Sequence, residues 1–215
     1  MKPTVIAVSG YSGSGKSTVV TQLSRKLKCA ALYFDDYASR KDFPEDLNAW
    51  LREGGDPNVI KTPLLQHHLM QLLNGEPVEL RKGNGWAEEY GIAHDKSKAE
   101  MIMPSSFIIV EEPFGKERKE IMNFVDFVVY LDVEPEVALA RRVHNLIHCL
   151  RNDPEALIGF LDHFLFDYMY RGVKEMYREV GNKVKANADL IVHANESIDE
   201  IVVNISDFIE NQRQL

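Results

Sequence analysis

The 215-residue sequence is poor in cysteine and has no long apolar run. Its two cysteines, Cys29 and Cys149, lie far apart, and neither belongs to a CxxC pair or another zinc-ligand spacing, so we expect both to be reduced, buried thiols. No window approaches the roughly 18 apolar residues of a membrane span, which excludes a membrane protein. The apolar run near the N-terminus, about five residues long, is too short for a signal-peptide core. We therefore expect a cytoplasmic protein.

Positive charge is also scarce, because 25 lysines and arginines stand against 33 aspartates and glutamates and leave a net charge of −8. This is the wrong sign for a protein that binds a nucleic-acid backbone, so we expect no nucleic-acid partner. Any polyanion must instead meet a local positive site. The hydrophobic share of 45% and the charged share of 27% are ordinary for a globular protein. From the length we expect one domain, spanning residues 1–215.

Short apolar strands alternate with helical patterns along the chain. Residues 4–8, TVIAV, are β-branched and apolar without polar alternation, which is typical of a strand buried on both faces of a parallel sheet. Further strands are predicted at 30–34, 107–110, 127–131 and 189–193. Helices are predicted at 16–28, 45–52, 59–74, 116–123 and 197–212. This alternation predicts an α/β fold, a parallel sheet with helices on both faces.

Two segments interrupt the alternation. Residues 76–105 carry several glycines around short β-like pieces, and we expect an inserted hairpin there. Residues 135–180 are predicted to form two helices joined near 152–154. The final predicted helix has a capping signature, because Ser197 is followed three residues later by Glu200.

A glycine-rich turn lies between the first predicted strand and the first predicted helix. Residues 10–17, GYSGSGKS, match G-x-x-x-x-G-K-[ST], and in this context the pattern indicates a phosphate-binding loop. Its glycines allow positive φ and bring several N–H groups toward phosphate oxygens, and the helix N-terminus adds partial positive charge. A chance match is expected in roughly one chain per hundred of this length. The candidate nucleotide-binding residues are Gly10, Ser12, Gly13, Ser14, Gly15, Lys16, Ser17 and Thr18.

Two residues of this loop carry further chemistry. Lys16 is a mobile point charge that can reach the β- and γ-phosphates of a nucleotide. Ser17 would place its hydroxyl on Mg²⁺, which a nucleoside triphosphate carries into such sites. We therefore expect ATP and Mg²⁺ as cofactors.

Three predicted strands run into carboxylates, at Asp35-Asp36, Glu111-Glu112 and Asp132. In a doubly wound sheet the ligand crevice lies at the carboxyl ends of the strands. The first pair supplies a candidate general base, with one of the two acids facing the acceptor; its alternative is a turn or helix cap. Glu111 is a candidate for Mg²⁺ through a coordinated water, and its alternative is a solvated edge residue.

Adjacent arginines follow on the predicted helix that begins after Pro135. Arg141 and Arg142, with Arg151 further on, would fold over the triphosphate as a lid. Their alternative is a solvated helix face.

Other nucleotide-binding classes lack their signatures. A GTPase would need N-K-x-D, and the nearest segment, residues 182–185, lacks the acid. We find no serine and glycine signature of a transporter-type ATPase. A small-molecule kinase remains, and its alternative from another class is a non-catalytic ATP-binding sensor.

The sequence resembles the uridine kinase and nicotinamide riboside kinase group of P-loop kinases, within a wider set that includes phosphoribulokinase and pantothenate kinase. The segments that carry the resemblance are VSGYSGSGKST at 8–18, FDDY at 34–37, IIVE at 108–111, LDVEPEVALARR at 131–142 and ADLIV at 188–192. The resemblance implies a three-layer P-loop NTPase fold with a small inserted hairpin and a helical lid over residues 135–180.

The resemblance also implies roles for individual residues. Asp35 would be the general base for an acceptor hydroxyl, Glu111 would serve the metal or the acceptor ribose, and Arg142 would belong to the lid. The predicted catalytic residues are thus Asp35, Lys16 and Arg142, with Arg141 beside the nucleotide. Ser17, Glu111 and Asp35 form the candidate magnesium set.

The acceptor itself stays open. The segment that follows Pro77 departs from the Pro-x-Tyr-Asp stretch of uridine kinases, so the acceptor is a nucleoside or related ribosyl compound, or a non-nucleoside such as pantothenate. Trp86, Tyr90 and His94 are candidates to stack on or hydrogen-bond a ring, and their alternative is packing. The expected partners are ATP and this small molecule, and a homodimer is compatible with the sequence.

Overall fold

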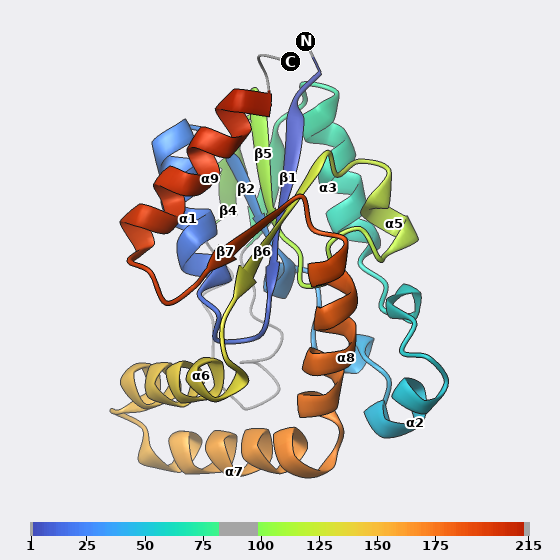
Figure 1. Cartoon of the computed structure of the whole chain (residues 1–215), viewed down its shortest axis with the longest axis vertical. Helices are drawn as coiled ribbons and strands as arrows, with labels where there is room; N and C mark the ends of the chain where they lie inside the picture. Colours follow the sequence, from blue (N-terminus) through green and yellow to red (C-terminus); the bar gives the residue numbers. More distant parts are fainter. Residues whose placement is uncertain (1, 82–98, 213–215) are drawn as a thin grey trace.

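A five-stranded parallel sheet forms the centre of the computed structural model, which describes residues 2–81 and 99–212 (Figure 1). The strand order is β2-β5-β1-β6-β7. The strands are β1 (Thr4–Gly10), β2 (Ala30–Tyr33), β5 (Phe107–Glu111), β6 (Phe127–Asp132) and β7 (Leu190–His193). All neighbouring pairs in this sheet are parallel, as the apolar strands of the sequence predict.

Each face of the sheet carries its own hydrophobic core because successive side chains of a strand point to opposite faces. On β1, Val5 and Ala7 enter one core, while Ile6 and Val8 enter the other. Helices α1 (Lys16–Leu27) and α9 (Ile198–Gln212) cover the second face, on the left in Figure 1. The first face is covered by α2 (Leu47–Arg52), α3 (Pro63–Leu73), α5 (Lys119–Met122) and α8 (Val173–Ala186). These layers confirm the predicted three-layer α/β fold.

Helices α6 (Pro135–Leu150) and α7 (Pro154–Tyr170) pack together beyond the carboxyl edge of the sheet, at the bottom of Figure 1. The prediction of two helices over 135–180 is wrong, because a second break at Gly172 separates α7 from α8. Gly172 has φ +86°, and a Cβ there would lie 2.7 Å from Oδ1 of Asn48 on α2. Apolar residues at helical spacing lie on both sides of the break, so periodicity alone does not reveal it, although the glycine is a local break signal.

The two arms of the predicted insertion form an antiparallel pair. Strands β3 (Val78–Arg81) and β4 (Ala99–Ile102) align Val78 with Ile102. Residues 82–98, which include Trp86, Tyr90 and His94, lie outside the described residues.

Smaller differences from the predicted boundaries concern strand and helix ends. The second strand ends at Tyr33, and a 3₁₀ turn over Phe34–Asp36 follows it. Further 3₁₀ turns lie at Arg40–Asp42 and Pro57–Val59. The predicted capping box is confirmed: the Ser197 amide donates to Glu200 Oε2 at 3.0 Å, and the Glu200 amide donates to Ser197 Oγ at 3.3 Å.

The two cysteines are less buried than the sequence predicts. Cys29 is half-buried and Cys149 is exposed on α6, so the expectation of two buried thiols is wrong. Within 2–81 and 99–212, no helix is both long enough and apolar enough to cross a membrane.

Candidate functional site

The glycine-rich loop curls between the end of β1 and the start of α1, as the motif predicts. Gly13 adopts φ +88°, and a Cβ there would lie 2.0 Å from the carbonyl oxygen of Ala138 on α6. Gly15, at φ +97°, is the N-cap of α1. Only glycine fits these two positions without strain, so the loop amides and the helix N-terminus form one concave surface.

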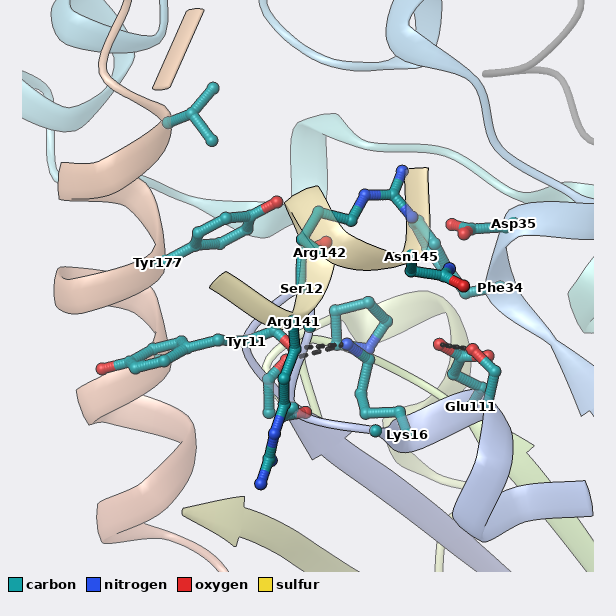
Figure 2. Close-up of a pocket in the computed structure, with 18 of the residues that line it drawn as sticks. Tyr11, Ser12, Lys16, Phe34, Asp35, Glu111, Arg141, Arg142, Asn145 and Tyr177 are labelled. Atoms are coloured by element: carbon teal, nitrogen blue, oxygen red, sulfur yellow. Dashed lines mark hydrogen bonds between the residues drawn. The ribbon is translucent and has the colours of Figure 1, made fainter. Parts of the chain in front are cut away.

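Lys16 lies buried within this loop. Its Nζ donates hydrogen bonds to the carbonyl oxygens of Gly10 at 3.1 Å and Tyr11 at 2.9 Å (Figure 2). Desolvation lowers the pKa of the amine, and the carboxylates of Glu111 and Asp35 oppose that shift. The loop thus holds the Lys16 amine at its centre.

Two carboxylates meet the loop from neighbouring strands. β5 lies between β1 and β2, and Tyr33 pairs with Glu111, so the ends of β2 and β5 lie side by side. Glu111 is buried, and its Oε1 accepts a hydrogen bond from Ser17 Oγ at 3.2 Å. Desolvation raises the pKa of Glu111 to about 7, against the opposing charge of Lys16. Asp35 is exposed toward the cavity that it lines; desolvation raises the pKa of its carboxyl, and the charges of Lys16 and then Arg142 oppose that shift.

Twelve of the candidate site residues line one cavity of about 680 Å³, a volume in the range of small-molecule sites. They are Gly10, Ser12, Gly13, Ser14, Gly15, Lys16, Ser17, Thr18, Asp35, Glu111, Arg141 and Arg142. Of the strand-end acids, Asp36, Glu112 and Asp132 are not among the lining residues. Asp132 instead accepts a hydrogen bond from Lys185 Nζ at 2.7 Å.

The two adjacent arginines of α6 point in different directions. Arg141 donates to the carbonyl oxygen of Ala194, before α9, at 2.9 Å. Arg142 extends toward Asp35 in Figure 2, and its guanidinium lies 6.0 Å and 5.9 Å from the ring centroids of Phe160 and Phe164 on α7. Arg151, the third predicted lid arginine, is exposed at the end of α6 and does not line the cavity.

Several aromatic residues that the sequence does not mark as site residues also line the cavity. Phe160 and Phe164 on α7 and Tyr177 on α8 line it. The i, i+4 spacing of the two phenylalanines predicts ordinary packing along one helix face, so nothing in the local sequence identifies them as cavity residues. Phe34, Phe43 and Phe114 line the side that holds Asp35 and pack against one another edge-on or tilted.

The loop fits a phosphate group. Within 2–81 and 99–212, Ser14 Oγ is among the few buried side-chain atoms without a hydrogen-bond partner, and it lies in the loop that holds the Lys16 amine. A buried hydroxyl without a partner and a desolvated cation are costly unless a ligand engages them.

The neighbouring oxygens fit a hard cation. Ser17 Oγ and Glu111 are in contact, and Asp35 lines the same cavity. The described part of the chain holds no group of three or more His, Cys, Asp or Glu side chains suited to a metal. Mg²⁺ suits such a place, since it takes one or two carboxylates plus phosphate oxygens and water.

The loop, the parallel sheet and this cavity define a P-loop small-molecule kinase. The sequence model of the Phosphoribulokinase / Uridine kinase family matches residues 5–148. The chain belongs to this family, which confirms the resemblance seen in its motifs.

Individual relatives match over nearly the whole chain. A uridine kinase of Clostridium tetani is 27% identical over 216 residues, 97% of each chain, and one of Staphylococcus carnosus is 27% identical over 219 residues, 98% of each. The solved structure of a possible uridine kinase from Bacillus stearothermophilus superposes with a TM-score of 0.53 at 21% identity over 89% of each chain. That structure supports the fold.

Proposed function

We propose that the protein transfers the γ-phosphoryl group of ATP to a hydroxyl of a small molecule, in first place the 5′-hydroxyl of a nucleoside or related ribosyl compound. The observation that carries this proposal is the meeting of Lys16, Glu111 and Asp35 around one cavity at the phosphate-binding loop. Two uridine kinases, each 27% identical to this chain over nearly its whole length, support a nucleoside acceptor.

Each side chain has a role that follows from its place. The loop amides and Lys16 hold the β- and γ-phosphates, while Arg141 lies beside the nucleotide. Ser17 and Glu111, with Asp35 nearby, hold Mg²⁺, which neutralises phosphate charge when it is bound. Asp35 accepts the proton of the attacking hydroxyl. Positioning and charge neutralisation thus account for the chemistry, without a covalent nucleophile.

Arg142 and the helices beyond the sheet close the site. The guanidinium lies between the loop and the aromatic residues of α7 and influences Asp35 electrostatically. A cation there stabilises the charge that develops on the transferred group. We assign α6 and α7 as the lid, because they cover the carboxyl edge of the sheet and help exclude water.

An acceptor screen tests the proposed function. ATP and Mg²⁺ are held fixed while nucleosides, other ribosyl compounds and alcohols such as pantothenate are varied, and ADP release is measured. We expect ADP release that depends on a nucleoside, with turnover on the order of 1–100 s⁻¹. The phosphorylated product is identified by mass spectrometry.

Other outcomes contradict parts of the proposal. A rate that depends on pantothenate but on no nucleoside would retain the kinase and reject the nucleoside acceptor. Saturable ATP binding without acceptor-dependent ADP release for any compound would favour a non-catalytic ATP sensor.

A further inference from the structure

A fully buried ion pair lies directly behind the two carboxylates of the site. Glu112 follows Glu111 at the end of β5, and both Glu112 and Arg118 are 0% exposed. The guanidinium binds both carboxylate oxygens, with Nε 3.2 Å from Oε1 and Nη2 paired with Oε2. Neither residue is among those that line the cavity.

Arg118 joins two further segments to this pair. Its Nη1 donates to the carbonyl oxygen of Ile60 at 3.2 Å and to Thr62 Oγ1 at 2.8 Å. The same nitrogen lies 3.4 Å from Glu120 Oε2 on α5. The end of β5 is therefore tied to the segment before α3 and to α5 through one side chain.

The guanidinium also supports the turn that carries the proposed base. Its central carbon lies 5.2 Å from the ring centroid of Phe34, which is 2% exposed and precedes Asp35. Cations above aromatic faces attract the ring, and the attraction grows when both groups are desolvated. Arg118 thus contacts Phe34, the residue next to Asp35, and Glu112, the residue next to Glu111.

Stability alone does not account for such a pair. Replacing a buried ion pair by apolar side chains of similar volume is often neutral or stabilising, because desolvation offsets much of the attraction. The planar guanidinium of Arg118 bonds several partners in a fixed geometry. Such a residue can hold active-site groups in place, because those groups need surroundings that are themselves rigid.

We propose that Arg118, held by Glu112 and stacked on Phe34, is a positioning residue that fixes Asp35 and Glu111 relative to each other for phosphoryl transfer. The inference rests on the proposed function, because it takes Asp35 as the base.

The first test replaces both partners of the pair. The variant Glu112→Met/Arg118→Met removes both charges of the pair together, so neither is left buried without the other. Glu120, which also lies near Arg118, keeps the hydrogen bond that the Thr62 amide donates at 2.9 Å. We expect a thermal unfolding midpoint close to that of the unmodified protein and unchanged ATP affinity. We also expect kcat to fall about 10–100-fold, the size of effect that a displacement of about 1 Å produces in an active site.

A second pair of variants keeps the test decisive if the double variant does not fold. Arg118→Lys keeps the positive charge but loses the planar fork, and Phe34→Leu removes the ring beneath it. Both should lower kcat without changing ATP affinity. The matched control is Phe208→Leu on α9, whose ring packs edge-on against Phe127 with centroids 5.6 Å apart, and it should leave kcat unchanged.

The outcomes separate this inference from the proposed function. A folded double variant or Arg118→Lys with an unmodified kcat would overturn the positioning role, as would a Phe34→Leu variant in which only the acceptor KM rises. If Asp35→Asn abolishes turnover while these variants are fully active, the positioning inference alone fails. If Asp35→Asn is fully active, the proposed role of Asp35 fails.

Discussion

The variant Asp35→Asn is expected to lose about 10²–10⁴-fold in turnover and to bind ATP as well as the unmodified protein. Asparagine has nearly the same shape but cannot take up the acceptor proton. ATP binding is spared because the loop amides and Lys16 are untouched. Initial rates of acceptor-dependent ADP release give kcat, and titration calorimetry gives the ATP affinity.

The neighbouring acid supplies a matched control. Asp36 belongs to the same 3₁₀ turn but is not among the residues that line the cavity, so Asp36→Asn should retain near-normal turnover. Equal activity of both variants would remove Asp35 from the role of general base.

The variant Lys16→Ala is expected to lose most of its affinity for ATP. Hydrogen bonds to charged groups contribute about 1.5–3 kcal/mol, so removing the amine should weaken ATP binding by about 10–100-fold. The effect should be larger for ATP than for adenosine, because only the nucleotide presents phosphates to Lys16. Calorimetric titration with both ligands measures this difference.

Lys26→Ala is the control for this variant, since Lys26 lies exposed on the same helix. It should bind ATP normally, and thermal unfolding of both variants shows that each is folded. A Lys16→Ala variant with normal ATP affinity would count against the assignment of the loop.

Most residues of the nucleotide-binding part of the site can be predicted from the sequence, because the features that determine them lie close together in the chain. The loop conformation depends on glycines within a few residues of one another, and β1 and α1 flank it in the chain. Strand-end carboxylates are also visible in sequence, since parallel strands end at one edge of the sheet. This argument predicts the Asp35-Asp36 pair and Glu111, and the choice of Asp35 within the pair follows from the resemblance to the kinase family.

Other features depend on contacts that no local pattern encodes. Which acid of the pair faces the cavity is set by the 3₁₀ turn that follows Tyr33. Glu112 reads as a second strand-end acid, yet it is buried against Arg118, six residues on. The break lies at Gly172, where φ is +86° and a Cβ would approach Asn48, which is distant in sequence.

The central claim is that the loop between β1 and α1 holds the triphosphate of ATP. A crystal structure with Mg²⁺ and a non-hydrolysable ATP analogue tests it most directly. We expect the β- and γ-phosphates against the amides of residues 13–18, with a phosphate oxygen about 2.7–3.2 Å from Lys16 Nζ. A nucleotide bound elsewhere, with Lys16 still donating to Gly10 and Tyr11, would contradict the claim.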